Sequence, residues 1–507
     1  MTAGAGTTDR AAFDALLPHH RIVPVVREVF LDAETPVGVF RRLAEGRPGA
    51  FLLESAQQGV WNRFSFVGVE SFGLLVADGD RVAWRAGSLS AERALGDAPT
   101  TGLAAIEHLL DRWATPRIEG LPRLTSGLVG HIGWEAVREL ERLPEAPARE
   151  VDVPTVAMSL VASLVVLDHR TGAAHLVANV IADGVDEPDA LWADAQARLD
   201  ALEAVLAADA PGAVAALDRE AAPEPRARVA ADDFRAMVDR SKRHIVDGDV
   251  FQVVLSARFD LETSATPLEV YRVLRMLNPS PYMYLLSLED AAGGAYAVVG
   301  ASPEALVTVH EGAATMHPIA GSRPRGADQA ADRALADELL ADPKERSEHV
   351  MLVDLARNDL AKVCQPGSVA VTELMAIERF SHIMHIVSTV EGRMRADASA
   401  VDAFRATFPA GTLSGAPKPR ALELIDELEP AQRGVYGGVV GWFALDGDAD
   451  LAIAIRTVTM RDGVAHVQSG AGLVADSDPE TELQEVRSKS AAPLRAVAVA
   501  STMRGRS

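Results

Sequence analysis

The stretch from residue 451 to residue 469 is the feature that most constrains the fold of this chain. Asp462-Gly463 stands there between two runs in which apolar and polar residues alternate. This dipeptide suits a tight turn whose residues have positive φ, so the stretch predicts an antiparallel β-hairpin. A second alternating run covers residues 250–259 and predicts a strand with one buried and one exposed face.

Segments with helical periodicity are interspersed with these strands. The apolar spacing predicts helices over 103–113, 190–206, 267–277, 333–360 and 479–502, and further strands over 64–69 and 159–167. The fold class is therefore α/β or α+β.

The composition changes between residues 206 and 233, where Ala, Pro and charged residues dominate. Such a stretch buries little apolar surface for each residue that it would have to order, and is typical of a linker. We expect an N-terminal domain over 20–209, a linker over 210–229 and a second domain over 230–500.

Charge and cysteine content exclude several classes of protein. The chain has 49 Lys and Arg against 72 Asp and Glu, a net charge of −23 at pH 7. Nucleic acids and anionic membranes bind clustered basic residues, so neither is an expected partner. The only cysteine, Cys364, excludes a disulfide framework and a thiolate zinc site. With no signal-peptide pattern and no apolar stretch long enough to cross a bilayer, we expect a cytoplasmic protein.

Two predicted helices carry paired carboxylates. Glu345 and Glu348 share one helical face, and Glu482 and Glu485 share another with Lys489. If these carboxylates met, they would repel by about 4 kcal/mol per pair at 4 Å and an effective dielectric constant near 20. A hard cation would turn this repulsion into binding, and oxygen ligands favour Mg²⁺ over zinc. The alternative is that both pairs lie on solvated helix faces.

Other residues are candidates for contacts with an anionic ligand. Arg456 ends a strand face of small residues and suits carboxylate recognition, although an outward-facing surface arginine fits the pattern as well. Tyr436 can donate its hydroxyl or simply pack. The backbone of Gly470-Ala471-Gly472 can approach an anion closely, but no βαβ unit follows, which excludes a dinucleotide fold.

Two further patterns give no assignment from the residues alone. The glycine-rich loop at 408–418 matches neither a P-loop nor a serine nucleophile motif. His382 and His385 have the spacing of metal ligands, but a packed, hydrogen-bonded histidine fits the same apolar context.

Taken together, several segments resemble the chorismate-binding enzymes, and within that family the large subunits of anthranilate synthase. The resemblance runs from about residue 21 to residue 497. The segments that carry it occur in the family's order at 249–256, 278–284, 300–304, 317–326, 351–359, 411–418 and 454–457.

The resemblance implies a two-layered fold with β-sheets packed in the core and helices outside. It implies that Mg²⁺ and chorismate bind in a cleft of the second domain. Glu348 and Glu485 would be the direct Mg²⁺ ligands, with Glu345 and Glu482 close by or acting through water. The residues expected to bind the substrate are Gly321, Ser322, Thr412, Tyr436, Arg456, Gly470, Ala471, Gly472 and Lys489.

The resemblance also implies the chemistry. Ammonia would add at C2 of chorismate while the C4 hydroxyl departs, with Glu304 as the general acid. His385 would serve the second step, the loss of pyruvate that gives anthranilate. Gln252 stands where water-adding relatives carry a lysine, which is consistent with ammonia as the nucleophile.

Partners and regulation follow from the same resemblance. The chain has no amidotransferase segment, so ammonia from glutamine would come from a separate amidotransferase subunit in a hetero-oligomer, commonly of two large and two small subunits. Tryptophan would inhibit at a pocket remote from Mg²⁺ formed by Leu53, Glu54, Ser55, Pro281, Tyr282 and Met283. The alternative is that these residues are part of the core.

The sequence departs from the family pattern at several positions. Ser322 stands in place of a usual threonine, Trp134-Glu135 in place of Tyr-Asp, Leu483-Gln484 in place of a Tyr-acid pair, and Ser488 in place of an asparagine. These changes leave open a synthase of secondary metabolism that stops at 2-amino-2-deoxyisochorismate. A separate alternative is a non-catalytic sensor of chorismate or tryptophan, although the metal-site glutamates, Glu304 and His385 are all present.

Overall fold

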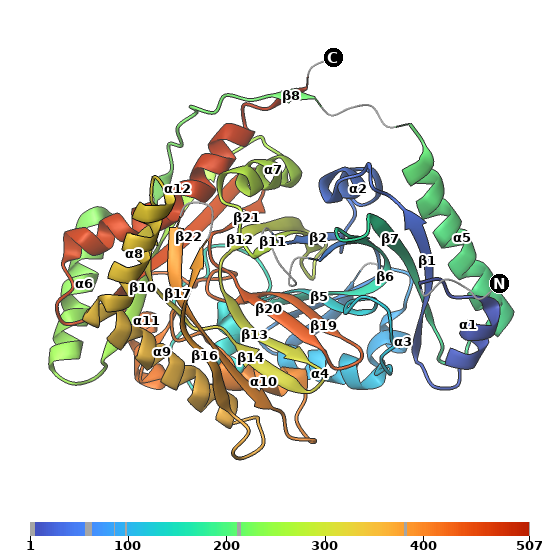
Figure 1. Cartoon of the computed structure of the whole chain (residues 1–507), viewed down its shortest axis with the longest axis horizontal. Coiled ribbons are helices and arrows are strands. Elements are labelled where there is room, and N and C mark those ends of the chain that lie inside the picture. The colour runs from blue at the N-terminus through green and yellow to red at the C-terminus, as the bar shows by residue number, and fades with distance from the viewer. Residues whose placement is uncertain are drawn as a thin grey trace.

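The structure is a computed structural model that describes residues 6–55, 63–85, 87–96, 99–209, 214–379 and 383–505. Its centre is a large, branched, antiparallel β-sheet with helices on the outside (Figure 1). The branch lies at β6 (Val156–Asp168), which pairs with β7 (Ala173–Ile181), β5 (Gly127–Ile132) and β3 (Phe64–Asp78). Two series of strands continue from β5 and β3 and form two layers.

Each series combines strands from both parts of the sequence. The first runs from β5 through β19 (Val439–Ala444), β20 (Ala449–Ile453), β13 (Ala305–His310), β14 (Ala313–Met316) and β17 (Ile383–Arg393), which also pairs with β15 (Ile319–Pro324) and β16 (Ala370–Arg379). The second runs from β3 through β2 (Phe51–Glu54), β11 (Tyr282–Glu289), β12 (Ala295–Ser302), β21 (Thr457–Arg461), β22 (Val464–Leu473) and β10 (Gln252–Glu262).

Short or peripheral strands complete the sheet. β1 (Ile22–Phe30) pairs with β7, β4 (Arg81–Arg85) with β3, and β9 (Arg226–Ala227) and β18 (Gly415–Ala416) with β10. A separate pair joins β8 (Ala215–Ala216) to β23 (Arg504–Gly505), near the C-terminal end in Figure 1.

A hydrophobic core drawn from strands of both series lies between the layers. It includes Val161, Tyr284, Val298 and Trp442, all at most 5% exposed. A hydrogen bond of 2.7 Å also joins His131 Nε2 of β5 to the Tyr296 hydroxyl of β12. Burial lowers the pKa of His131 to about 3, so this imidazole is neutral and spans the layers without a charge.

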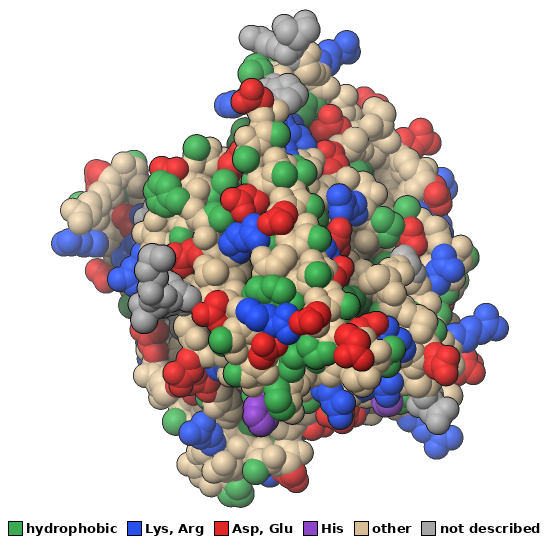
Figure 2. Space-filling model, turned by 90° about the vertical axis from the view of Figure 1, so that its right-hand side faces the viewer, with side chains coloured by type: hydrophobic (Ala, Val, Ile, Leu, Met, Phe, Trp, Pro, Cys, Tyr) green, Lys and Arg blue, Asp and Glu red, His purple; other side chains and the backbone are tan. Residues whose placement is uncertain are grey.

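The helices cover the outer faces of the layers (Figure 1). Figure 2 shows one outer face on which acidic and basic side chains are interspersed rather than segregated. No helix among the described residues is long and apolar enough to cross a membrane. The helices are α1 (Arg10–Leu16), α2 (Pro36–Leu43), α3 (Ala91–Leu95), α4 (Gly102–Arg112), the 3₁₀ helix η2 (Trp134–Glu139), α5 (Pro188–Ala207), α6 (Ala231–Val246), α7 (Pro267–Leu277), α8 (Gln329–Ala341), α9 (Pro343–Ala361), α10 (Ala400–Thr407), α11 (Lys418–Leu428) and α12 (Pro479–Ala500).

The mixed, two-layered fold class predicted above is confirmed, as are several elements. Helix α7 has the predicted bounds, and Thr266 and Glu269 close its N-terminus as a capping box. The predicted hairpin turn joins β21 to β22, with φ of 51° at Asp462 and 76° at Gly463. The hairpin is shorter than predicted, because the chain breaks at Arg456 and residues 451–453 belong to β20.

Two predicted elements differ from the structure. The helix expected over 333–360 is two helices, because Asp342 precedes a proline and adopts an extended conformation with ψ of 115°. Its carboxylate then caps α9. Strand β10 is buried on both faces instead of one, because Ser256 and Arg258 on its second face are enclosed with the carboxylates of Glu429 and Glu150.

The predicted linker over 210–229 contains β8 and β9, while its residues 210–213 lie outside the described part. The division of the chain into two domains stays a prediction. Strand pairing nevertheless joins the two parts twice, at β2 with β11 and at β5 with β19.

We therefore predict that a fragment covering residues 230–500 does not fold on its own. It would expose the edges of β11 and β19, and unpaired strand edges promote aggregation. Near-ultraviolet circular dichroism and thermal unfolding, with the full chain as the control, measure this outcome. A monomeric fragment with one cooperative unfolding transition would contradict it.

Candidate active site

The predicted catalytic and substrate-binding residues lie together where α9 and α12 face the sheet. Helix α9 packs on β15 and β17, and α12 packs on β22. The charge of Glu485 on α12 contributes to the raised pKa of Glu348 on α9, so these two carboxylates lie close together. The site therefore assembles residues that lie far apart in the sequence.

Glu304 lies between β12 and β13 and is held by its side chain and its backbone. The Thr412 hydroxyl donates a hydrogen bond of 2.9 Å to Glu304 Oε1, and the amide of Ile453 donates to the carbonyl of Glu304. Burial raises the pKa of Glu304 to about 7, although the Thr412 hydrogen bond and the charge of Lys489 oppose the rise. A carboxyl group with this pKa is substantially protonated near neutral pH and can act as an acid.

Lys489 lies near this carboxyl group, and Arg456 contacts the backbone of Lys489. Lys489 Nζ is 2.6 Å from Glu485 Oε1 and donates to the carbonyl of Gly470. Arg456 donates from Nη1 to the carbonyl of Lys489 at 2.9 Å and has a left-handed φ of 53°. Burial lowers the pKa of Arg456, but an arginine still keeps its charge at neutral pH. These cations supply the positive charge that an anionic ligand would need in an otherwise acidic chain.

The glycines of β22 leave space for neighbouring polar groups. A Cβ atom at Gly470 would lie 2.9 Å from the Tyr436 hydroxyl, and one at Gly472 would lie 2.7 Å from Gln252 Nε2. Ala471 is fully buried in the hydrophobic core, so only its backbone can contribute to a site. The structure thus brings Gln252 and Tyr436 against the predicted glycine segment.

His385 on β17 lies opposite Ser322 on β15. Its Nδ1 is 2.9 Å from the carbonyl of Gly321, and since a carbonyl only accepts, Nδ1 carries the proton. Burial lowers the pKa of His385, and the nearby charge of Arg456 acts in the same direction. The imidazole is therefore neutral at pH 7. His382, the other histidine of this pattern, lies outside the described residues.

The four predicted metal-site carboxylates come from facing helices. Burial raises the pKa of Glu348, and the charges of Glu345 and Glu485 raise it further. Burial also raises the pKa of Glu482, again with a contribution from Glu485. This mutual repulsion of oxygen ligands fits a hard cation such as Mg²⁺.

The side chains are not arranged as a closed metal site. Within the described ranges, no group of three His, Cys, Asp or Glu residues is positioned to hold a metal ion. Glu485 is paired with Lys489, and Glu345 lies 3.4 Å from Arg323. The donor types fit Mg²⁺, and the assignment of Glu348, Glu485, Glu345 and Glu482 as its ligands stays a prediction.

The residues predicted to bind tryptophan are neighbours on β2 and β11. Glu54 is paired with Met283, and Leu53 with Tyr284. The Tyr271 hydroxyl donates to Glu54 at 2.5 Å, and Arg275 donates to its second oxygen at 3.1 Å. Glu54 is buried and has both carboxylate oxygens engaged, so part of the predicted pocket also serves the core.

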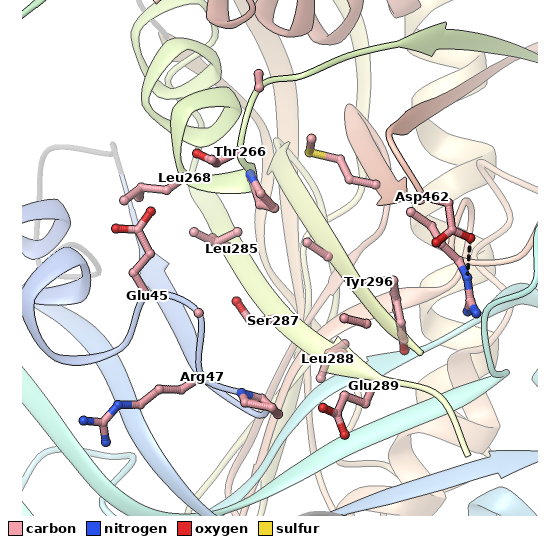
Figure 3. A pocket seen from close by; sticks show the side chains of 18 of the residues that line it. Glu45, Arg47, Thr266, Leu268, Leu285, Ser287, Leu288, Glu289, Tyr296 and Asp462 are labelled. Atoms are coloured by element: carbon pink, nitrogen blue, oxygen red, sulfur yellow. Dashed lines mark hydrogen bonds and ion pairs between the residues drawn. The ribbon is translucent and has the colours of Figure 1, made fainter. Parts of the chain in front are cut away.

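A separate cavity of about 410 Å³ lies between the segment after α2, the start of α7 and the strands β11, β12, β21 and β22. Figure 3 shows Leu285, Ser287 and Tyr296 at its wall, with Glu45 and Arg47 on the opposite side. None of the site residues predicted from the sequence lines it. The cavity therefore lies apart from the candidate active site.

A cluster of four residues that contact one another carries no role in the sequence-based prediction. Arg433 and Glu429 form a buried ion pair of 2.7 Å, and Trp134 and Glu135 lie against Arg433. Their only sequence signals are the spacing of opposite charges four residues apart and the unusual Trp134-Glu135 pair.

Comparisons with known proteins define the class. The chorismate binding enzyme family matches residues 50–495, and the chain therefore belongs to this family. Within the family, the chain is similar to component 1 of anthranilate synthase. It is 50% identical to that protein from Arthrobacter globiformis, covering 97% of this chain and 93% of the relative. It is 47% identical to that of Mycobacterium tuberculosis, covering 98% and 97%.

Solved structures agree with this class. Anthranilate synthase component I from Streptococcus pneumoniae superposes with a TM-score of 0.75 at 32% identity, covering 92% of this chain and 99% of that one. The menaquinone-specific isochorismate synthase from Escherichia coli superposes with a TM-score of 0.69 at 18% identity, covering 96% and 99%. The second similarity shows a shared fold alone.

We predict that Glu304→Gln flattens the pH dependence of stability. The folded-state pKa of Glu304, about 7, lies above its ordinary value of 4.5. The stability linked to this proton is fully present below about pH 4.5 and is lost as the pH rises through 7. The thermal midpoint of the variant should therefore fall less than that of the wild type between pH 5 and pH 8.

The matched control is Glu224→Gln, at an exposed position, which should leave the wild-type slope unchanged. Equal slopes in the wild type and in Glu304→Gln would show that Glu304 titrates at an ordinary pKa.

Proposed function

We propose that this chain is the large subunit of an anthranilate synthase, which converts chorismate and ammonia to anthranilate and pyruvate in tryptophan biosynthesis. The observation that carries the proposal is Glu304, a buried carboxyl group with a raised pKa that receives a hydrogen bond from Thr412 near the charge of Lys489. The similarity to anthranilate synthase component 1 over nearly the whole chain supports it.

Chorismate is a dicarboxylate, and the site supplies groups that suit it. The cations of Arg456 and Lys489, the Tyr436 hydroxyl and the backbone at 470–472 would hold the carboxylates, with Gly321 and Ser322 near the ring side. Mg²⁺, held by Glu348 and Glu485 with Glu345 and Glu482 nearby, would offset the charge of a carboxylate and fix its orientation. Arg456 and Lys489 are anchored by backbone carbonyls, so they are already oriented when the ligand arrives.

In the first step a C–N bond forms and a C–O bond breaks. The nitrogen of ammonia attacks C2, the ring double bonds shift, and the hydroxyl leaves from C4. Glu304 gives its proton to the leaving oxygen, so that water departs, and the new ammonium group loses a proton to solvent. Gln252 is a neutral amide beside Gly472 and does not activate water as a base, which favours ammonia as the nucleophile.

In the second step the proton at C2 is removed and the C3–O bond breaks. The enolpyruvyl group leaves and becomes pyruvate after protonation, and the ring becomes aromatic. His385 is the proposed residue for this step, because its Nδ1 proton is held by the carbonyl of Gly321. The neutral imidazole is therefore fixed in one tautomer.

A second candidate function is the synthesis of 2-amino-2-deoxyisochorismate without the loss of pyruvate, as in secondary metabolism. The specific observation that favours it is Ser322, which lies opposite His385 in the β15–β17 ladder. Serine there retains the hydroxyl group of the usual threonine but loses the methyl group that would limit its rotamers. A less restrained hydroxyl group beside His385 would affect the second step rather than the first.

The ammonia source in this proposal is a separate glutamine amidotransferase subunit. The name component 1, which the relatives carry, implies a partner component. We therefore propose a hetero-oligomer of large and small subunits that works in the cytoplasm. The only cysteine, Cys364, is buried, which makes it unsuitable as the nucleophile that a glutamine amidotransferase needs.

The product assay tests the function. We expect the purified chain to release fluorescent anthranilate and pyruvate in equal amounts from chorismate, ammonium and Mg²⁺. Chelation of Mg²⁺ with EDTA should abolish turnover, and excess Mg²⁺ should restore it. Mass spectrometry of the products and a coupled lactate dehydrogenase assay measure both compounds.

The alternatives give different results in the same assay. An aminated product without pyruvate would identify the chain as a 2-amino-2-deoxyisochorismate synthase. If chorismate binds but no product of either kind appears, the chain is a sensor, and the proposed function is wrong.

We also propose feedback inhibition by tryptophan at Leu53, Glu54, Ser55, Pro281, Tyr282 and Met283. Supporting this, β2 and β11 place Glu54 opposite Met283.

We predict that Ser55→Phe, which adds bulk beside this segment, raises the tryptophan concentration for half-inhibition at least about tenfold, a loss of about 1.4 kcal/mol of binding. Ser88→Phe, at an exposed position, is the matched control, and equal inhibition of both variants would assign residues 53–55 to the core.

A further inference from the structure

Arg433 and Glu429 are an unusual pair for a protein interior. Their side chains are 1% and 3% exposed, and their charged groups are 2.7 Å apart. Removing two charges from water costs several kcal/mol for each ion, which their attraction repays only when further hydrogen bonds satisfy both groups. The presence of a buried ion pair therefore does not show that it stabilises the fold. The role of this pair is inferred from its other contacts.

The guanidinium of Arg433 donates four hydrogen bonds to its surroundings. It donates two hydrogen bonds to Glu429, at 2.9 Å from Nε and 2.7 Å from Nη2. It also donates to the carbonyls of Leu413 at 2.7 Å and Val254 at 2.8 Å. The ring of Trp134 covers its face, with 4.2 Å between Cζ and the ring centroid.

These contacts tie together two segments of the candidate active site, the Thr412 loop and strand β10. Leu413 follows Thr412, whose hydroxyl donates to Glu304. Val254 lies on β10, two residues after Gln252, and its amide donates to the carbonyl of Ser414. Glu429 accepts hydrogen bonds from the backbone and side chain of Ser256, also on β10.

The first part of the chain fixes the backbone of Arg433. The carboxylate of Glu135 accepts from the amides of Arg433 at 3.0 Å and Gly434 at 3.1 Å. Trp134 and Glu135 form the start of η2. Trp134 and Glu135, which are far from the catalytic motifs in the sequence, therefore contact Arg433 at its guanidinium face and at its backbone.

We propose that Arg433 is a positioning residue for the amination of chorismate. Arg433 holds the Thr412 loop in register with Glu304, and Trp134 and Glu135 in turn hold Arg433. The inference rests on the proposed function for its catalytic consequence. The structural part of the proposal does not depend on catalysis. The planar guanidinium of Arg433 orients the loop, and lysine cannot provide the same forked arrangement of N–H donors.

A double-mutant cycle on the full chain tests this role. Thr412→Val removes the hydroxyl that reaches Glu304, and Arg433→Lys removes the fork that holds Leu413. We expect each change to lower kcat at least about tenfold with little change in KM for chorismate, since both act on the reacting geometry. Because both act through the same hydrogen bond, the double variant should be about as slow as the slower single variant.

Two further variants separate positioning from folding. Arg433→Met combined with Glu429→Gln removes both charges, leaves no unpaired ion in the core, and should also show the low kcat. Arg138→Lys is the matched control, because Arg138 lies in η2 and pairs with Asp426 at 2.7 Å without touching the Thr412 loop. It should retain the wild-type kcat.

Hydrogen exchange gives a readout that does not depend on activity. In Arg433→Lys, amides of the peptide 408–418 should exchange at least about tenfold faster than in the wild type, while Arg138→Lys leaves them unchanged. Multiplicative losses of kcat in the cycle together with unchanged exchange of this peptide would overturn the positioning role. A wild-type protein that does not aminate chorismate would instead overturn the proposed function. The exchange result would still show whether Arg433 holds the Thr412 loop.

Discussion

The whole structure depends on β6 pairing with three strands at once, because this branch point joins the two layers. The close approach of backbones around it requires residues without side chains. Gly130 of β5 lies so near β6 that a Cβ atom would be 1.9 Å from the carbonyl oxygen of Ala157. Its partner in the ladder, Gly441 of β19, would place one 2.0 Å from the carbonyl oxygen of Asp450. Glycine at these positions lets strands from distant parts of the chain form one continuous layer.

The two layers bring positive and negative side chains together in the candidate active site of a chain that is acidic overall. The net charge of −23 belongs to the chain as a whole, whereas burial of Arg456 weakens the screening of its charge by solvent. Both cations donate to backbone carbonyls, and Lys489 also neutralises Glu485. Their positions therefore do not depend on a bound ligand. The proposed binding of a dianion together with a divalent cation relies on fixed charges of each sign, which the site holds.

Local patterns in the sequence predicted the elements whose cause is local. The helix over 267–277 and the Asp462-Gly463 turn appear where expected. The predicted helix over 333–360 failed at Pro343, where the restriction on Asp342 outweighed the apolar periodicity. The burial of both faces of β10 and the Arg433 cluster could not be predicted, because Val254, Leu413 and Trp134 meet only through tertiary pairing. The approach of Glu304 to Thr412 needed the family resemblance, since no spacing in the sequence connects them.

Strand β20 shows how tightly the layers connect distant sites. Burial and the charge of Asp450 on β20 raise the pKa of Tyr282, so Asp450 lies close to this residue of the proposed inhibitor pocket. Burial raises the pKa of Asp450 to about 6, because its carboxyl group lies in an interior with little water. Three residues later on the same strand, the amide of Ile453 donates to the carbonyl of Glu304. Protein interiors are close-packed and transmit small displacements. A shift of Tyr282 relative to β20 must therefore either separate it from Asp450 or move the backbone that holds Glu304.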